Sequence, residues 1–150
     1  MENLASILGS HDSSLCLIFL FRLVLAGILG AVVGLDRSYH AKVAGVRTHF
    51  LVAVGSALIM IVSQHGFWDV IQPGGDQNIR LDVSRVAAQI VSGIGFIGAG
   101  TIIFQKQMVR GLTTAAGLWT VSGIGMAVGG GLYLPAVAVA ILALIAFEFF

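Results

Sequence analysis

The 150-residue chain is poor in charge, since only 10% of its residues are Asp, Glu, Lys or Arg, against about 25% in soluble domains. The formal net charge is +1 and no run of Lys or Arg occurs, so the chain lacks the electrostatic footprint of a nucleic-acid-binding protein. The single cysteine, Cys16, can form no disulfide within the chain. Together with 57% hydrophobic residues, the scarcity of charge predicts an integral membrane protein embedded in a lipid bilayer.

The chain also lacks the residue patterns of an enzyme, a cofactor site or a metal site. No nucleophile stands in a pattern with a base and an orienting group, and the four histidines have no zinc-ligand spacing. No carboxylate falls in the middle of a predicted span, and the side predicted to be inner offers Asp36 and Glu148. We therefore expect no enzymatic activity, no cofactor and no bound metal.

A glycine pattern in residues 93–98, GIGFIG, matches the GxGxxG of dinucleotide-binding proteins. That motif requires a preceding strand, a helix that opens at the glycines, and an acidic residue about 20 positions later. The glycines instead lie inside an apolar run, and no acidic residue occurs between Asp82 and Glu148. The pattern therefore indicates helix packing.

Five apolar segments are candidate membrane helices, at about residues 15–35, 50–68, 83–104, 112–130 and 132–149. They predict an all-α integral membrane protein, a compact bundle of about five transmembrane helices, with four or six as the alternatives. No linker or shift in composition divides the chain, so we expect one transmembrane domain over residues 1–150, with no C-terminal cytosolic domain.

The basic residues predict the orientation of the bundle, because cytoplasmic loops are enriched in Lys and Arg. The loops at residues 36–49 and 105–110 hold five of the eight basic residues. The acidic residues gather in the other loops. This bias predicts that the N-terminus lies outside and the C-terminus inside.

The third segment, residues 83–104, carries no charge after Arg85 and is crowded with small residues. Small residues let helix backbones approach closely in membranes, so this segment is predicted to be the buried helix around which the others pack. Pairs of small residues four positions apart also occur in the first segment, at Gly30 and Gly34, and in the fourth, at Gly125 and Gly129. We expect close packing, and self-association into a homo-oligomer, through Gly30, Gly34, Gly93, Gly95, Gly98, Ala99, Gly100, Gly125 and Gly129.

Polar residues in the apolar segments suggest a pocket. Arg85 and Gln89 lie one helical turn apart; Arg85 can pair with Asp82 at the helix start, or stand at the mouth of a pocket that Gln89 continues. Arg22 either snorkels to the outer interface or faces the bundle interior. If it faces inward, the pocket has walls from spans 1, 3 and 4, near Arg22, Arg85 and Trp119.

Seven polar residues crowd the loop between the first two spans: Asp36, Arg37, His40, Lys42, Arg47, Thr48 and His49. Most of them are expected to face water or lipid headgroups. Asp36 ends one span and Arg47 begins the next, so these two can pair. Thr113 and Thr114 open the fourth span, and Trp119 near its middle is expected to pack against a neighbouring helix.

Three blocks of the sequence resemble the MgtC/SapB family of bacterial inner-membrane proteins. They are GLDRSYHAKVAGVRTHFLVAVGSALIM, RVAAQIVSGIGFIGAGTII and GLTTAAGLWTVSGIGMAVGGGLY, and the resemblance covers about residues 15–149. The family often has Glu where this chain has Asp36. By this resemblance, the characteristic polar positions are Asp36, Arg47, Thr48, Arg85, Gln89, Thr101, Thr113, Thr114 and Trp119.

The resemblance implies a multi-pass protein of the bacterial inner membrane that supports growth in low magnesium and, in pathogens, virulence. It implies regulation of a membrane partner, such as a magnesium transporter or the F-type ATP synthase. Many longer members add a cytosolic domain after the fifth helix, and this chain stops at Phe150. The alternative is transport of an ion or small solute through the polar pocket.

Overall fold

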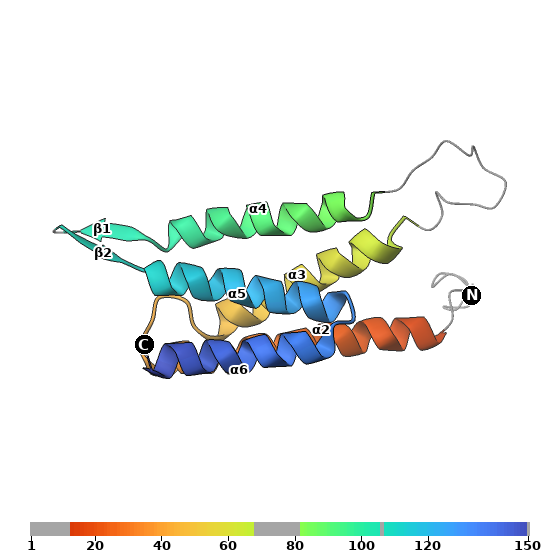
Figure 1. The fold of residues 1–150 in the computed structure, drawn as a ribbon, viewed down its shortest axis with the longest axis horizontal. Helices are drawn as coiled ribbons and strands as arrows, with labels where there is room; N and C mark the ends of the chain where they lie inside the picture. Colours follow the sequence, from red (N-terminus) through yellow and green to blue (C-terminus); the bar gives the residue numbers. More distant parts are fainter. Residues whose placement is uncertain (1–12, 68–81, 106, 150) are drawn as a thin grey trace, which may run out of the picture.

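The computed structural model describes residues 13–67, 82–105 and 107–149 of the chain. Within these residues it forms five helices and one hairpin of two short strands (Figure 1). The elements are α2 (Ser13–Tyr39), α3 (Val46–His65), α4 (Ser84–Gly100), β1 (Ile103–Gln105), β2 (Met108–Arg110), α5 (Leu112–Gly129) and α6 (Tyr133–Phe149). Helices α2, α3 and α5 are long and apolar enough to cross a membrane, and α6 is a shorter apolar helix.

The helices lie side by side along the long axis of the molecule, which therefore has two ends (Figure 1). The end of α2, the start of α3, the hairpin and the end of α6 gather at one end, called the Arg37 end. The start of α2, the end of α3, the start of α4 and the turn between α5 and α6 gather at the other, called the Arg22 end. Successive helices run in opposite directions (Figure 1), and the number of membrane spans and their orientation stay predictions.

The central helix is α5, not the third predicted span. Helix α5 packs against α2, α3, α4 and α6, and nine of its 18 residues are buried, against four of 17 in α4. Helix α4 lies at the edge of the bundle in Figure 1. The prediction that residues 83–104 form the buried centre is therefore wrong, because an apolar helix in a membrane can face lipid as readily as protein.

The third predicted span also ends earlier than expected. Helix α4 stops at Gly100, and β1 pairs antiparallel with β2, with Phe104 opposite Val109. β-Branched and aromatic residues favour the extended conformation, and Ile102, Ile103 and Phe104 come directly after Thr101, the residue that caps the helix. Gly111 joins the hairpin to α5 with φ of 92°, where a side chain would strike the carbonyl oxygen of Thr101. The described chain is thus helical with one short hairpin.

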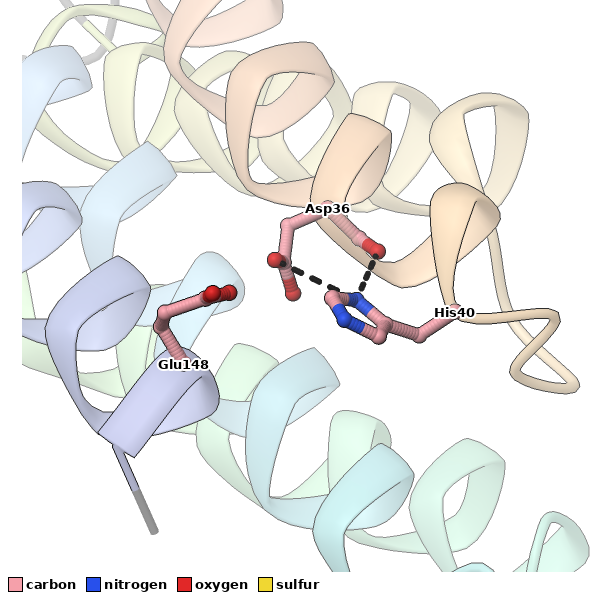
Figure 2. Close-up of side chains that lie close together, drawn as sticks. All are labelled: Asp36, His40 and Glu148. Atoms are coloured by element: carbon pink, nitrogen blue, oxygen red, sulfur yellow. Dashed lines mark hydrogen bonds and ion pairs between the residues drawn. The ribbon is translucent and has the colours of Figure 1, made fainter.

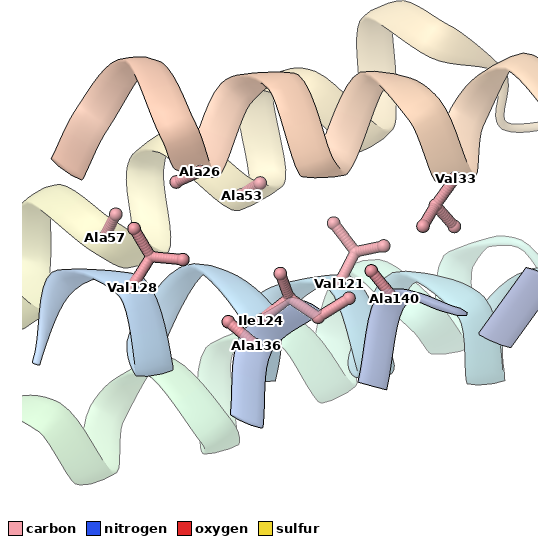
Figure 3. Close-up of a cluster of buried hydrophobic side chains, with 9 residues drawn as sticks. All are labelled: Ala26, Val33, Ala53, Ala57, Val121, Ile124, Val128, Ala136 and Ala140. Carbon is pink, nitrogen blue, oxygen red and sulfur yellow. The ribbon is translucent and has the colours of Figure 1, made fainter. Parts of the chain in front are cut away.

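Small residues build the core where α2, α3, α5 and α6 meet (Figure 3). A Cβ added at Gly30 would lie 2.7 Å from the carbonyl oxygen of His49, one at Gly129 would lie 2.5 Å from that of Ala57, and one at Gly125 would strike Ala53. Gly34 makes a comparable approach to α3. The core residues around these contacts are Ala26, Val33, Ala53, Ala57, Val121, Ile124, Val128, Ala136 and Ala140.

The small residues of α4 behave differently, with one exception. A Cβ at Gly93, Gly95 or Gly100 would meet nothing within 4 Å, and Ala99 is exposed. Gly98 alone faces α5, where its Cβ would lie 3.6 Å from that of Ala115. Contrary to prediction, the open glycines are not packing positions within this chain: Gly93 lines a cavity between α3, α4 and α5, and a Cβ at Gly95 or Gly100 would reach no neighbouring helix.

Candidate functional site

The most unusual side chain of the bundle is Arg37, in the last turn of α2. Only 3% of its surface is exposed. Its Nε lies 3.6 Å from Oδ2 of Asp36, and its guanidinium carbon lies 3.9 Å from the ring centre of Phe147 on α6. Arg37 was predicted to face water or lipid headgroups, and this is wrong because Phe147 covers it.

His49, in the first turns of α3, is fully buried beside this arginine. Its Nδ1 lies 2.9 Å from the carbonyl oxygen of Gly45. Since a carbonyl can only accept, Nδ1 carries the proton, and Nε2 of the neutral ring presents a lone pair. A Cβ at Gly117 of α5 would lie 3.6 Å from this Nε2 and 3.0 Å from Cζ of Phe147. His49 was also predicted to be solvated, and the structure corrects this.

Asp36, Arg37, His49 and Phe147 form what is called here the Arg37 cluster, to which α2, α3 and α6 contribute. Four buried polar atoms of this cluster have no hydrogen-bond partner in the described part of the chain: Oδ2 of Asp36, Nε and Nη1 of Arg37, and Nε2 of His49. Leaving such an atom unpaired costs about 1 to 3 kcal/mol. Ionisable groups inside membrane helices are expensive and mark functional sites by default, so this cluster is the candidate site.

Asp36 also connects to the surface of the Arg37 end (Figure 2). His40 Nδ1 lies 3.5 Å from Oδ1 of Asp36 and 3.0 Å from its backbone carbonyl oxygen. Glu148 of α6 reaches the same place, so that one ligand atom from each of Asp36, His40 and Glu148 lies within 4.8 Å of the others. Arg47, the partner considered from the sequence, is exposed and forms no ion pair with Asp36, because Arg37 and His40 lie closer.

A cavity of about 410 Å³ lies between α3, α4 and α5, and Gln89 is one of its polar walls. Ser56 and Ser122 also line it, and their hydroxyls are hydrogen-bonded at 2.9 Å. The pocket predicted between spans 1, 3 and 4 is thus displaced, since neither Arg22 nor Trp119 lines this cavity. Helix α3 takes the place that the prediction gave to span 1.

Arg85 and Asp82 lie at the start of α4, and both are exposed. The backbone N–H of Arg85 is 3.3 Å from the carbonyl oxygen of Asp82. The hydroxyl and the backbone N–H of Ser84 donate to the Asp82 carboxylate at 2.6 and 3.0 Å, and they hold the pKa of that carboxyl below its ordinary value. Arg85 adds to this effect from close by.

Arg22 faces the bundle interior at the other end from Arg37. Its Nε donates to the hydroxyl of Tyr133 at 3.1 Å, and its Nη1 donates to the carbonyl oxygen of Gly129 at 2.7 Å. The partner that the sequence left unnamed is therefore the corner between α5 and α6. Because its Nε and Nη1 are both hydrogen-bonded, Arg22 ties α2 to this corner, and it does not line the cavity beside Gln89.

The remaining predicted positions are scattered. Thr48 is half-buried, Thr114 is buried, and the hydroxyl of Thr101 donates to the carbonyl oxygen of Gly98 at 2.7 Å. Thr113 lines a cavity of about 460 Å³ between α5 and α6, which it shares with Phe147 of the Arg37 cluster. Trp119 is 58% exposed, and it lines a cavity of about 270 Å³ together with Ala136 and Val139 of the neighbouring helix α6.

Arg37 and His49 are the functional candidates that the sequence reasoning missed, although a signal existed. Arg37 follows the buried Gly30 and Val33 at seven and four residues, which places all three on one face of α2. His49 precedes the buried Ala53 at the same helical spacing. The helical spacing therefore predicts that the buried faces of α2 and α3 extend beyond their apolar runs to Arg37 and His49.

Comparison with known proteins identifies the relatives of this chain. The MgtC family matches residues 23–150. The protein YhiD of Escherichia coli strain K12, described as a candidate magnesium transporter, is 46% identical over 132 residues, which are 88% of this chain and 60% of that protein. Protein MgtC of Salmonella typhimurium is 42% identical over 128 residues, 85% of this chain and 50% of that protein.

An uncharacterized protein of Haemophilus influenzae is 40% identical over 146 residues, 97% of this chain and 60% of that protein. The chain therefore spans about half to three fifths of the length of the curated relatives that it matches. No solved structure shows significant similarity to it.

Proposed function

The chain belongs to the MgtC family, and on that premise we propose that it supports magnesium homeostasis and adaptation or virulence under low magnesium by regulating partner membrane proteins. In this proposal it is a multi-pass protein of the bacterial inner membrane that forms homo-oligomers and contacts a partner such as a magnesium transporter or the F-type ATP synthase. The magnesium link rests on the description of the relative YhiD and on the family.

The exposed outer face of α4 is the observation that favours regulation of a partner over transport. Ser92 and Phe96 are exposed on it, Phe96 to 85%, and the open Gly95 lies on the same helix. Polar side chains at membrane depth normally face protein or a water-filled cavity, and open glycines allow close approach of another helix. A partner helix packed on α4 would contact the exposed polar side chain and could approach closely at the open glycine.

The closed interior of the bundle supports the same proposal. Between α2, α3 and α5, Gly30, Gly125 and Gly129 bring backbones into direct contact, and alanine, valine and isoleucine fill the remaining space. A path for a hydrated ion requires a polar lining. The Arg37 cluster is polar but lies buried at one end of the bundle, where it suits a regulated contact better than a channel.

A matched pair of substitutions tests the partner surface. A Cβ added at Gly95 on α4 or at Gly123 on α5 would meet nothing within 4 Å, so Gly95→Leu and Gly123→Leu should both preserve the fold. We expect Gly95→Leu to abolish growth in low magnesium and co-purification of the membrane partner, whereas Gly123→Leu keeps both. Normal growth and normal co-purification of Gly95→Leu would contradict the proposal.

Transport of an ion or small solute is the second candidate, and the cavity lined by Gln89, Ser56 and Ser122 favours it. Its test is flux of Mg²⁺ and of small polar solutes into liposomes that contain the purified chain. A transporter would show flux that Gln89→Leu reduces and that Gln105→Leu, on the exposed hairpin, leaves unchanged. Absence of flux, with growth still dependent on Gly95, would leave regulation as the function.

A further inference from the structure

Three side chains at the Arg37 end face one space, although they come from opposite parts of the chain. Asp36 and His40 belong to the end of α2 and the turn after it, and Glu148 to the last turn of α6. One ligand atom from each lies within 4.8 Å of the other two. Figure 2 shows both carboxylates and the imidazole directed toward one another.

The orientation of His40 matches that of a metal ligand. Its Nδ1 lies 3.0 Å from the backbone carbonyl oxygen of Asp36, and since a carbonyl only accepts, Nδ1 donates and Nε2 of the neutral ring keeps its lone pair. Histidines that bind metals almost always donate their other ring N–H to a carbonyl or carboxylate in this way, which fixes both the tautomer and the ring orientation.

The carboxylates supply a second and independent observation. Oδ2 of Asp36 is buried and accepts no hydrogen bond within the described residues, and Arg37, buried and only 3% exposed, lies 3.6 Å from it without a hydrogen bond. Glu148 approaches the same aspartate, and it has no ion pair in the described chain. Arg37 offsets only one of these two negative charges, so a cation bound between the carboxylates would offset the other.

From this geometry we infer that Asp36, His40 and Glu148 bind one divalent transition-metal ion, such as Mn²⁺ or Zn²⁺, which ties the end of α2 to the end of α6. An imidazole ligand suits Zn²⁺ better than it suits Mg²⁺, so the site is distinct from the magnesium link proposed above, and Mn²⁺ serves as its spectroscopic probe. Ligand atoms of an octahedral ion lie about 3 Å apart. His40 and Glu148 are exposed and can close the remaining distance, while water fills the other positions.

The ion would act on the Arg37 cluster through α6. Glu148 directly follows Phe147, whose ring covers the guanidinium of Arg37 at 3.9 Å. An ion held by Glu148 and Asp36 fixes this last turn of α6 against α2 and keeps the ring in place. Metal occupancy would thus control access to Arg37.

Electron paramagnetic resonance of Mn²⁺ added to the purified chain in nanodiscs tests the site. We expect one bound ion per chain with an electron–nuclear coupling to nitrogen, displaced by Zn²⁺ and not by an equal concentration of Mg²⁺. Glu148→Gln should weaken Mn²⁺ binding by more than about 100-fold, beyond the effect of losing an outer-shell partner. His40→Ala should remove the nitrogen coupling.

The opposite end of the bundle provides matched controls. His65→Ala and Asp82→Asn replace exposed residues of the same types at the Arg22 end, and Mn²⁺ binding should be unchanged in both. The site is overturned if the unsubstituted chain binds no Mn²⁺ at millimolar concentration, or if its bound Mn²⁺ shows no nitrogen coupling. It is equally overturned if the folded Glu148→Gln and His40→Ala chains bind as the controls do.

Discussion

Each end of the bundle holds one arginine of α2 that contacts other helices, but the hydrogen bonding of the two guanidinium groups differs. At the Arg22 end, the guanidinium donates to Tyr133 and to the carbonyl oxygen of Gly129, so that it ties α2 to the corner between α5 and α6. At the Arg37 end, the guanidinium is more deeply buried, and its Nε and Nη1 have no hydrogen-bond partner in the described residues.

This difference separates a structural charge from a functional one. A satisfied hydrogen bond to a charged group contributes about 1.5 to 3 kcal/mol, whereas an unpaired buried polar atom costs a similar amount. A bundle that contains both arrangements gains stability at the Arg22 end and gives up stability at the Arg37 end. Proteins tolerate destabilising arrangements of this kind mainly at functional sites, so we place the functional site at the Arg37 end.

The largest expected effect comes from removing the carboxylate beside Arg37. Asp36→Asn leaves a buried guanidinium without its counter-charge, and breaking a buried pair in this way costs about 3 kcal/mol or more. Unfolding of the purified protein in a detergent titration measures this loss. Asp82→Asn, an exposed acid at the Arg22 end, is the control and should unfold close to the unsubstituted protein.

A double substitution sharpens that result. If the cost of Asp36→Asn arises from the stranded charge, then adding Arg37→Met should recover a large part of it, since contacting residues do not behave additively. Equal unfolding of Asp36→Asn and Asp82→Asn would show that Asp36 and Arg37 are not energetically paired.

A smaller effect is expected where α5 passes the Arg37 cluster. A Cβ at Gly117 would lie 3.0 Å from Cζ of Phe147, so Gly117→Ala should push that ring off Arg37 at a cost of about 1 to 3 kcal/mol. Gly123→Ala, in the same helix, meets nothing within 4 Å and should be neutral or slightly stabilising. Unfolding titrations of the two variants compare them, and equal stabilities would contradict the close packing at Gly117.

At the Arg22 end, the expected loss is that of one hydrogen bond. Tyr133→Phe removes the hydroxyl that accepts from Arg22 at 3.1 Å and should cost about 1 kcal/mol. Growth in low magnesium should stay normal, because this end is structural. A growth defect in a variant that folds and accumulates normally would break the distinction between the two ends.

The smallest effect concerns pH at the start of α4. Hydrogen bonds from Ser84 lower the pKa of Asp82 in the folded protein, so their contribution to stability is present above the ordinary carboxyl pKa. It is lost as pH falls through the lowered folded value. The difference in Tm between the unsubstituted protein and Ser84→Ala should therefore exist at neutral pH and vanish in acid. A difference that persists in acid would contradict the assignment.

Much of the helical layout could be predicted from the sequence, because long apolar runs with few charges have few other structures available to them. The first predicted span lies within α2, and the second overlaps most of α3. The last two nearly coincide with α5 and α6. The family was predicted from three sequence blocks and is confirmed. The hairpin was missed because Ile102, Ile103 and Phe104 are as apolar as the helix they follow.

Burial was harder to predict than helix position. In a membrane, apolarity does not distinguish a lipid-facing helix from a buried one, so α4 was taken for the centre. The Arg37 cluster was missed for a different reason: charges near the end of a span were assumed to reach water. Only the contact with Phe147, from the far end of the chain, buries Arg37, and no local pattern contains that contact.

The most direct measurement compares Arg37→Met with Arg22→Met for unfolding of the purified protein and for growth in low magnesium at matched expression. We predict that Arg37→Met fails to support growth, and that adding Asp36→Asn to it, which removes the whole ion pair, recovers stability but not growth. Arg22→Met should lose about 2 kcal/mol and still support growth. Normal growth with Arg37→Met would contradict the claim that the functional site lies at the Arg37 end.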